Sequence, residues 1–173
     1  QEDLTTISAE QLPPCDVIIH MAGIAGPIDY KKYPLETIET ATVSTKKLLE
    51  KALEWGSKFV FISSSEIYGN PDPGFIPTPE DYNGNASCQS PRSCYVESKR
   101  LGETLCYVYN KYFGVNTNVV RPFNIYGPMF TNTDYRIIPT IMRNAILNKP
   151  VFIYGTGEQT RTFCFYSDAI DGI

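Results

Sequence analysis

Features that the sequence lacks narrow its class at the outset. No apolar run approaches the roughly 18 residues of a membrane-spanning helix, and the polar N-terminus does not follow the pattern of a signal peptide. We therefore expect no membrane partner. Positive charge is not in excess either, since the net charge is -4 and the pI is near 5.0. This balance argues against a nucleic-acid binder, whose affinity depends on neutralising phosphates.

Metal-binding and disulfide patterns are missing as well. The single histidine, His20, ends a short apolar run, where a packing role is favoured over catalysis. We expect no metal site. The cysteines are odd in number and form no C-x-x-C pair, so we expect reduced thiols in a cytoplasmic protein. They are Cys15, Cys88, Cys94, Cys106 and Cys164.

Glycine is absent before Gly23. A dinucleotide-binding fold usually opens with a strand, a glycine-rich turn and a helix whose amides bind the pyrophosphate. Gly155-Thr156-Gly157 does not supply that turn, because a third glycine is missing and the segment follows a late strand pattern. The chain is therefore either the middle piece of a longer polypeptide or a degenerate relative of such a fold. We favour the first, because the catalytic residues described below are intact.

Strand and helix patterns alternate along the chain. At 173 residues, with 42% hydrophobic residues, there is room for one domain, or one domain and a small lobe. Alternation predicts an α/β fold with parallel strands and helices on both faces of the sheet. A long surface loop is expected at 70–91. We predict strands at 16–20, 58–63, 116–121 and 151–154, and helices at 34–55, 93–113 and 136–147.

Two short strings carry chemistry. The run Ser63–Gly69 (Ser-Ser-Ser-Glu-Ile-Tyr-Gly) follows a predicted strand, so its hydroxyls should emerge at a carboxyl end. Tyr95 and Lys99 lie four residues apart, on one face of a predicted helix. A lysine near a tyrosine favours the phenolate and lowers its pKa, and a serine can orient the same substrate hydroxyl. The pair alone is weak evidence in a chain with twelve tyrosines, but the serine string before it strengthens the case.

With these strings, the chain resembles the extended short-chain dehydrogenase/reductases that modify nucleotide sugars, the NAD-dependent epimerase/dehydratase family. The resemblance runs from about Asp16 to the last residue, and 91–107 with Gln159-Thr160-Arg161 is most similar to UDP-glucuronate decarboxylases. Further matching segments, in family order, are His20–Gly23, Pro91–Lys99, Arg121–Pro128 and Tyr154–Arg161.

The resemblance implies a Rossmann-like doubly wound parallel sheet, truncated at the N-terminus. Residues 1–125 would form the dinucleotide-binding domain, without its first strands and glycine-rich loop, and 126–173 part of a substrate-binding lobe. NAD is the implied cofactor, and small residues would let the backbone approach it. The implied cofactor-binding residues are Ala22, Gly23, Ser63, Tyr95, Lys99 and Pro122.

By the same resemblance, Tyr95 removes the proton from the C4 hydroxyl of a sugar, and Lys99 also hydrogen-bonds the nicotinamide ribose. Ser64 shares the reacting oxygen and contacts the substrate. The hydride passes to NAD and leaves a 4-keto sugar, in which a carboxylate at C5 is lost readily as CO2.

Four more residues are implied in the reaction or in substrate binding. Glu66 corresponds to a second acid/base of dehydratases and decarboxylases, where simple 4-epimerases have Thr or Ser. Ser65 stands where one class of dehydratases has Asp. Arg161, with a planar fork suited to a diphosphate or carboxylate, and Asn124 would hold the substrate. Each also has a plain structural reading, as a solvated turn residue or a surface arginine.

One departure from the family and three function classes remain. Ala41 and Ser44 stand where the family usually has Asn and Gly, which puts cofactor binding and the reaction in doubt. The leading class is UDP-glucuronate decarboxylation, with a nucleotide-sugar 4,6-dehydratase or 4-epimerase as alternatives. A non-catalytic nucleotide-sugar-binding relative and a short-chain reductase of small ketones are the others.

The expected partners are a nucleotide sugar and a second copy of the chain. The family usually forms dimers through the helix that carries the catalytic tyrosine. Here that helix has more apolar and aromatic positions than one buried face needs. They are Leu101, Leu105, Val108, Tyr109 and Tyr112.

Overall fold

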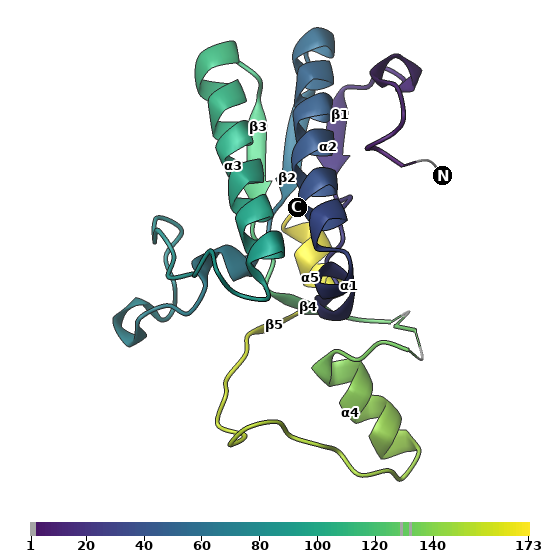
Figure 1. Cartoon of the computed structure of the whole chain (residues 1–173), viewed down its shortest axis with the longest axis vertical. Coiled ribbons are helices and arrows are strands. Elements are labelled where there is room, and N and C mark those ends of the chain that lie inside the picture. The colour runs from purple at the N-terminus through teal and green to yellow at the C-terminus, as the bar shows by residue number, and fades with distance from the viewer. Residues whose placement is uncertain (1–2, 129, 132) are drawn as a thin grey trace. The chain divides into compact units, whose positions relative to one another are not determined.

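The computed structural model describes residues 3–128, 130–131 and 133–173. The chain divides into two compact units, Gln1–Pro122 and Phe123–Ile173 (Figure 1). The division lies close to the predicted boundary after residue 125. That the first unit binds a dinucleotide and the second a sugar stays a prediction.

The first unit is built on a three-stranded parallel sheet. Its strands are β1 (Val17–His20), β2 (Lys58–Ile62) and β3 (Thr117–Val120), in the order β1-β2-β3. The central strand β2 is the most apolar, and Phe59, Val60 and Phe61 are buried. All three carboxyl ends meet at one edge, as expected for parallel pairing. This confirms the α/β fold with parallel strands.

Two long helices cover the sheet, α2 (Pro34–Trp55) and α3 (Ser93–Phe113). Their bounds are the predicted ones, and each ends at a glycine in the left-handed conformation, Gly56 (φ 69°) and Gly114 (φ 75°). The core lies between these helices and the sheet. It contains Ile18, Leu48, Leu49, Ala52, Phe59, Phe61, Cys106, Tyr109 and Val115.

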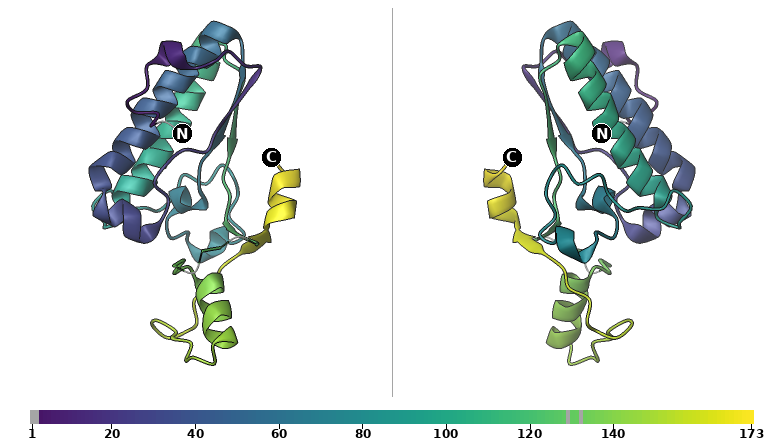
Figure 2. Two further views of the ribbon diagram at one scale, coloured as in Figure 1. Left: turned by 90° about the vertical axis from the view of Figure 1, so that its right-hand side faces the viewer. Right: turned by 90° about the vertical axis from the view of Figure 1, so that its left-hand side faces the viewer.

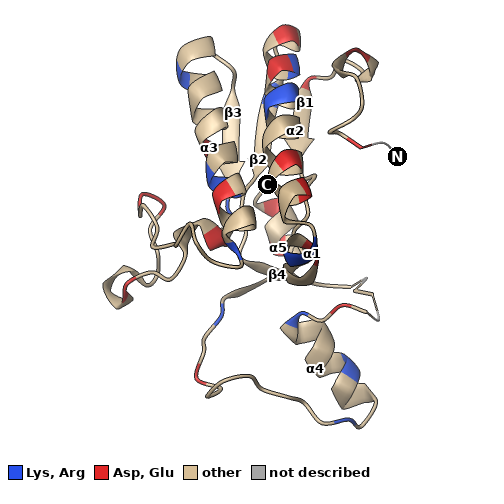
Figure 3. Cartoon of the chain, viewed as in Figure 1, with Lys and Arg blue, Asp and Glu red and all other residues tan. Residues whose placement is uncertain are grey.

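Both helices lie on the same face of the sheet (Figure 2). On the other face, Val17 and Ile19 are 48% and 53% exposed. The prediction of helices on both faces is therefore wrong for this unit, because both crossovers, β1 to β2 and β2 to β3, pass over one side. On α2, charges of both signs are interleaved along the helix (Figure 3), as in the ion pair between Lys46 and Glu50 at 3.0 Å.

The approach of α3 to β2 is unusually close. A Cβ atom placed on Gly102 would lie 2.3 Å from Cζ of Phe61, whose side chain is 1% exposed. Only a residue without a side chain leaves room for the ring. The contact brings the N-terminal half of α3, which carries Tyr95 and Lys99, against the carboxyl end of β2.

Shorter elements connect these parts. They include α1 (Pro27–Lys32) and the 3-10 turns η1 (Ala9–Gln11), η2 (Ser65–Tyr68) and η3 (Pro73–Phe75), none of which was predicted. The predicted loop at 70–91 contains η3 and is otherwise irregular. Its backbone is tied down at Asn85, whose N–H donates to the Tyr68 carbonyl at 2.9 Å.

The second unit contains a parallel pair of short strands, β4 (Asn124–Tyr126) and β5 (Phe163–Phe165), with α4 (Ile137–Ile146) and α5 (Tyr166–Asp171). The strand predicted at 151–154 is wrong. Those residues are irregular, and Tyr154 is 85% exposed. An apolar run forms a strand only where a partner strand pairs with it, and here β4 pairs with β5 instead.

Two observations bear on the class of protein. Within the described residues, no helix combines the length and apolar character needed to cross a bilayer. All five cysteines carry free thiols, as predicted.

The close contact at Gly102 makes a stability prediction. Gly102→Ala should lower the free energy of unfolding by up to about 2 kcal/mol, because overpacking a core costs about 1–3 kcal/mol and the gain in helix propensity offsets only about 1 kcal/mol of this. Chemical denaturation of the full-length protein measures the change. In a Phe61→Leu background the penalty should largely disappear. A gain in stability of about 1 kcal/mol in Gly102→Ala would show that the ring yields without cost.

Candidate active site

The predicted site residues of the first unit gather at the carboxyl edge of the sheet. Ala22 and Gly23 follow β1, the serine string follows β2, and Pro122 follows β3. The Ser65 N–H donates to the Pro122 carbonyl at 3.0 Å. Parallel pairing therefore brings together three segments that are far apart in the sequence.

Tyr95 and Ser64 meet at this edge. Tyr95 lies in the first turn of α3 and is half-buried. Burial raises the pKa of the phenol, and a hydrogen bond from Ser64 opposes that rise. The expectation of a lowered Tyr95 pKa is wrong for this structure, because desolvation of the phenolate outweighs the favourable contacts. That Ser64 and Tyr95 share the reacting oxygen of a substrate stays a prediction.

Lys99 lies behind the tyrosine and is 6% exposed. Its Nζ donates to the Ile62 carbonyl at 2.7 Å and lies 6.0 Å from the centre of the Tyr95 ring. Burial lowers the pKa of Lys99 to about 8. An ammonium has three N–H donors, so a group with one carbonyl partner can also serve a ligand hydroxyl.

Ser64 also organises the turn that follows it. Its Oγ accepts the backbone N–H of Glu66 at 3.2 Å and so caps η2. Ser65 and Glu66 are half-exposed. The Glu66 carboxylate forms an ion pair with Arg92, with 2.6 Å between Nη2 and Oε2.

Arg92 and Tyr30 are site residues that the sequence reasoning missed. Arg92 Nε donates to the Tyr30 hydroxyl at 3.1 Å. The Tyr30 ring is 1% exposed and stacks on Tyr95, with centroids 5.2 Å apart and planes 13° apart. Arg92 lies within the string Pro91–Tyr95, which could have drawn attention to it, whereas nothing in the sequence pointed to Tyr30.

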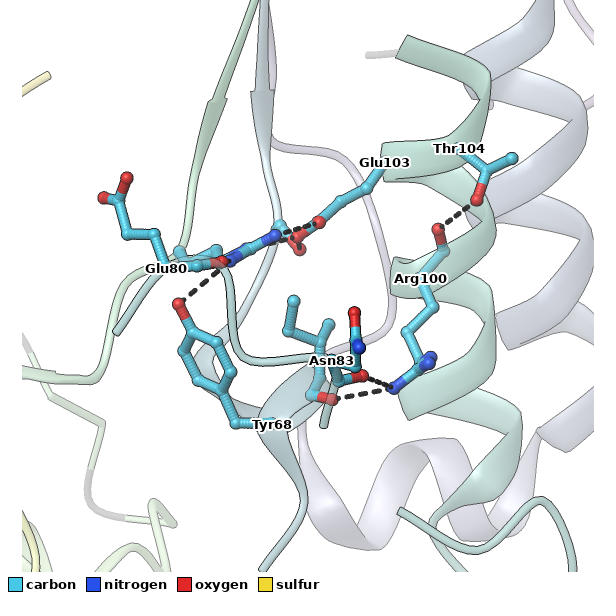
Figure 4. A network of polar contacts seen from close by, with 9 residues as sticks. Tyr68, Glu80, Asn83, Arg100, Glu103 and Thr104 are labelled. Atoms are coloured by element: carbon cyan, nitrogen blue, oxygen red, sulfur yellow. Dashed lines mark hydrogen bonds and ion pairs between the residues drawn. The ribbon is translucent and has the colours of Figure 1, made fainter. Parts of the chain in front are cut away.

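A second network joins Glu103 to Tyr68 and Glu80 through Arg121 (Figure 4). Glu103 accepts the Ser63 hydroxyl at 2.5 Å and both Nε and Nη2 of Arg121, at 2.9 and 2.7 Å. Arg121 Nη1 reaches the Tyr68 hydroxyl at 2.9 Å and the Glu80 carbonyl at 2.6 Å. Ser63, predicted to bind the cofactor, thus directs its hydroxyl to Glu103, and its role toward a cofactor stays a prediction.

His20 has the surroundings of a packing residue. It is 2% exposed, and its Nε2 lies 3.0 Å from Thr45 Oγ1. Burial, and then the charge of Lys99, lower its pKa to about 4, so the ring is neutral near pH 7. Nδ1 has no hydrogen-bond partner among the described residues, and neither has Oγ of Ser44. Ala41 and Ser44, the departure noted above, are both buried in α2.

The end of β1 is open. A Cβ atom on Gly23 would meet no atom within 4 Å, and Ala22 is half-buried. These small residues leave their backbone accessible, which fits the close approach of a dinucleotide. Among the residues that the structure describes, no three His, Cys, Asp or Glu side chains gather as a metal site would require.

The two predicted substrate contacts lie in the second unit. Asn124 begins β4, and its Nδ2 donates to the Thr162 carbonyl at 2.9 Å. Arg161 is exposed just before β5, with Nη1 bonded to the Thr160 carbonyl at 2.6 Å. The β4–β5 pairing therefore brings Asn124 next to the segment that carries Arg161.

The buried lysine makes a prediction about pH. Below about pH 8, Lys99 is protonated in both states. Between about 8 and the ordinary value of 10.5, the unfolded chain binds a proton that the folded chain does not. Relative to Lys99→Met, the wild-type free energy of unfolding should thus rise with pH across this window, by at most a few kcal/mol. Denaturation of both proteins from neutral to alkaline pH measures the difference, and a constant difference would contradict the burial.

Similarity to known proteins extends over most of the chain. Residues 1–173 match the NAD dependent epimerase/dehydratase family. UDP-glucuronic acid decarboxylase 1 of Xenopus tropicalis is 39% identical over 158 residues, which are 91% of this chain and 37% of that protein. UDP-glucuronic acid decarboxylase 5 of Arabidopsis thaliana is also 39% identical, over 91% of this chain and 46% of that protein. The chain thus spans less than half the length of these relatives.

Solved structures share the fold. The UDP-glucuronic acid 4-epimerase of Bacillus cereus, solved in complex with NAD, has a TM-score of 0.81 at 30% identity, over 99% of this chain and 52% of that one. The UDP-N-acetylglucosamine 4-epimerase of Methanobrevibacter ruminantium M1 has a TM-score of 0.86 at 26% identity, over 98% and 54%. The chain belongs to the NAD-dependent epimerase/dehydratase family, whose enzymes modify nucleotide sugars.

Proposed function

We propose that the protein carrying this chain is an NAD-dependent nucleotide-sugar enzyme that transiently oxidises C4, and that its reaction is decarboxylation of UDP-glucuronate. The observation that supports this most is the position of Lys99, which is buried with its Nζ bonded to the Ile62 carbonyl and 6.0 Å from the centre of the Tyr95 ring, while Ser64 caps the turn that carries Glu66. Similarity to the UDP-glucuronic acid decarboxylases adds to it.

The residues present fit one half of the implied cofactor. Gly23 offers open backbone, and the Lys99 ammonium has N–H donors beyond the one that Ile62 accepts. We propose that these two, with Ala22 and Pro122, border the nicotinamide side. The residues named here do not include a cradle for the pyrophosphate. When bound, NAD accepts a hydride from the sugar carbon.

Tyr95 acts as the base in this proposal. Its phenolate takes the proton of the C4 hydroxyl, and Ser64 holds the same oxygen by a hydrogen bond. Because burial raises the pKa of the phenol, the charge of Lys99 is needed close by when Tyr95 ionises. The buried position of Lys99, fixed by the Ile62 carbonyl, keeps that charge near the edge of the sheet.

The second stage concerns C5. The ketone at C4 makes the substrate a β-keto acid, so the bond from C5 to the carboxylate breaks and its electron pair forms an enolate. C5 then receives one proton, which we assign to Glu66 as a relay from water. Arg161 and Asn124 are proposed to hold the substrate, and Ser65 to border it.

Epimerisation is the second candidate, because the solved UDP-glucuronic acid 4-epimerase of Bacillus cereus resembles this chain at 30% identity. A carboxylate at position 66 favours decarboxylation, since epimerisation at C4 needs no proton at C5.

We also propose a homodimer through α2 and α3, where Leu101 and Tyr112 are 46% and 70% exposed.

Substrate conversion tests the reaction. The full-length protein should convert UDP-glucuronate with loss of CO2 and give a pentose nucleotide or its 4-keto form, observed by mass spectrometry. dTDP-glucose, GDP-mannose and UDP-N-acetylglucosamine serve as controls. Loss of water from one of these, with UDP-glucuronate untouched, would contradict decarboxylation and support a dehydratase. An unchanged mass with altered chromatography would support an epimerase.

The base is tested by removing one oxygen. Tyr95→Phe keeps the ring that stacks on Tyr30 but loses the ionisable hydroxyl. Folding should be nearly unchanged, while turnover should fall on the order of 10²–10⁴-fold, the usual contribution of a general base. Circular dichroism and steady-state kinetics check the two parts. Activity near the wild-type level would rule out Tyr95 as the base.

A further inference from the structure

We propose that Arg92 is a positioning residue that holds Glu66 beside the base and so controls the proton step that follows oxidation. The inference rests on the proposed function and deepens it. It starts from a closed ring of contacts that no single sequence string contains. The bonded and stacked contacts run from Ser64 to Glu66, Arg92, Tyr30 and Tyr95, and the influence of Ser64 on the pKa of Tyr95 closes the ring.

The ion pair by itself would carry little weight. The side chains of Arg92 and Glu66 are 47% and 37% exposed, and exposed pairs of this kind are usually weak. Arg92, however, has a second, fixed partner. Its Nε donates to the hydroxyl of Tyr30, and because the guanidinium is planar, this bond sets the direction in which Nη2 meets Glu66.

Tyr30 is a rigid anchor for that bond. It is 1% exposed, its N–H donates to the Gly26 carbonyl at 2.9 Å within α1, and its own carbonyl lies 3.4 Å from the Cys94 thiol that donates to it. Its ring stacks on Tyr95. The buried Tyr30 side chain therefore positions two residues. Its ring face contacts Tyr95, the proposed base, and its hydroxyl accepts the hydrogen bond from Arg92.

The backbone of Arg92 is part of the same arrangement. Its carbonyl accepts the N–H of Tyr95 at 3.0 Å and that of Val96 at 3.1 Å, which begins α3. Arg92 thus joins Glu66 on η2 to the first turn of the helix that carries the base. A single arginine therefore connects Glu66 and Tyr95, the two groups that we propose to transfer protons.

The charges in the ring also affect the base. Four ionisable groups face Tyr95: Tyr30 from α1, Glu66 from η2, and Arg92 and Lys99 from α3. Glu66 and Tyr30 raise the pKa of Tyr95, and Arg92 lowers it. Without the arginine, the Glu66 carboxylate acts on the phenol unopposed, so the pKa of Tyr95 should rise.

Three substitutions in the full-length protein separate these effects. Arg92→Met keeps an unbranched apolar stem and removes the charge, Arg92→Lys keeps the charge without the fork, and Tyr30→Phe keeps the stacking without the hydroxyl. Arg100→Met is the matched control, because Arg100 also donates to η2, at the Ile67 carbonyl, but pairs with Glu97 rather than Glu66. Thermal unfolding confirms that each variant is folded.

The measurement compares the rate at which reduced cofactor forms with the rate at which the decarboxylated product appears. With UDP-glucuronate, at a pH on the plateau of each variant's profile, Arg92→Met should form reduced cofactor in a single turnover much as the wild type does, yet yield the decarboxylated product about tenfold more slowly. The basic limb of its pH profile should move to higher pH. Arg92→Lys and Tyr30→Phe should fall between it and the wild type. Equal behaviour of Arg92→Met and Arg100→Met in both measurements would overturn the inference.

A second measurement does not depend on turnover. If the wild type converts no sugar of the panel, the proposed function fails, and the ring is tested by NMR titration of labelled tyrosines. The Tyr95 resonance, assigned with Tyr95→Phe, should titrate at higher pH in Arg92→Met and at the wild-type pH in Arg100→Met. An unchanged titration in Arg92→Met would overturn the positioning role.

Discussion

The packing of one phenylalanine against one glycine sets the geometry on which the site depends. The Phe61 ring occupies the space that a side chain at position 102 would need, so α3 lies directly on β2. One turn before Gly102, Lys99 can then reach the Ile62 carbonyl at the end of the strand. A further turn back, Tyr95 meets Ser64. A larger residue at 102 would push this face of the helix away from the strand end.

Two arginines hold the loops around that strand end. Arg121 is bidentate to Glu103, with side chains only 25% and 15% exposed, so loss of either partner would leave a poorly hydrated charge. Arg92 is more exposed and pairs with Glu66. The first pair fixes Ser63 and so the start of the serine string, whereas the second reaches the residue proposed for the later proton step.

The family fold does not select the reaction. Relatives that resemble this chain include proteins described as decarboxylases and as 4-epimerases, over matched regions that cover nearly all of this chain. In the proposed function, the Tyr95, Lys99 and Ser64 group would serve any chemistry that begins with oxidation at C4. What happens next depends on groups placed near C5, which directs attention to Glu66 and Arg92.

The sequence by itself determined the features that depend on local pattern. The bounds of α2 and α3 followed from helical periodicity and glycine stops, and the Tyr95–Lys99 spacing fixed their common face. Tertiary structure decided the rest. A strand needs a partner strand to pair with. β5 pairs with β4, whereas residues 151–154 are irregular. Burial reversed the expected direction of the Tyr95 pKa. Arg92 meets Tyr30 across 62 positions of the chain, a distance over which local sequence patterns carry no information about contact.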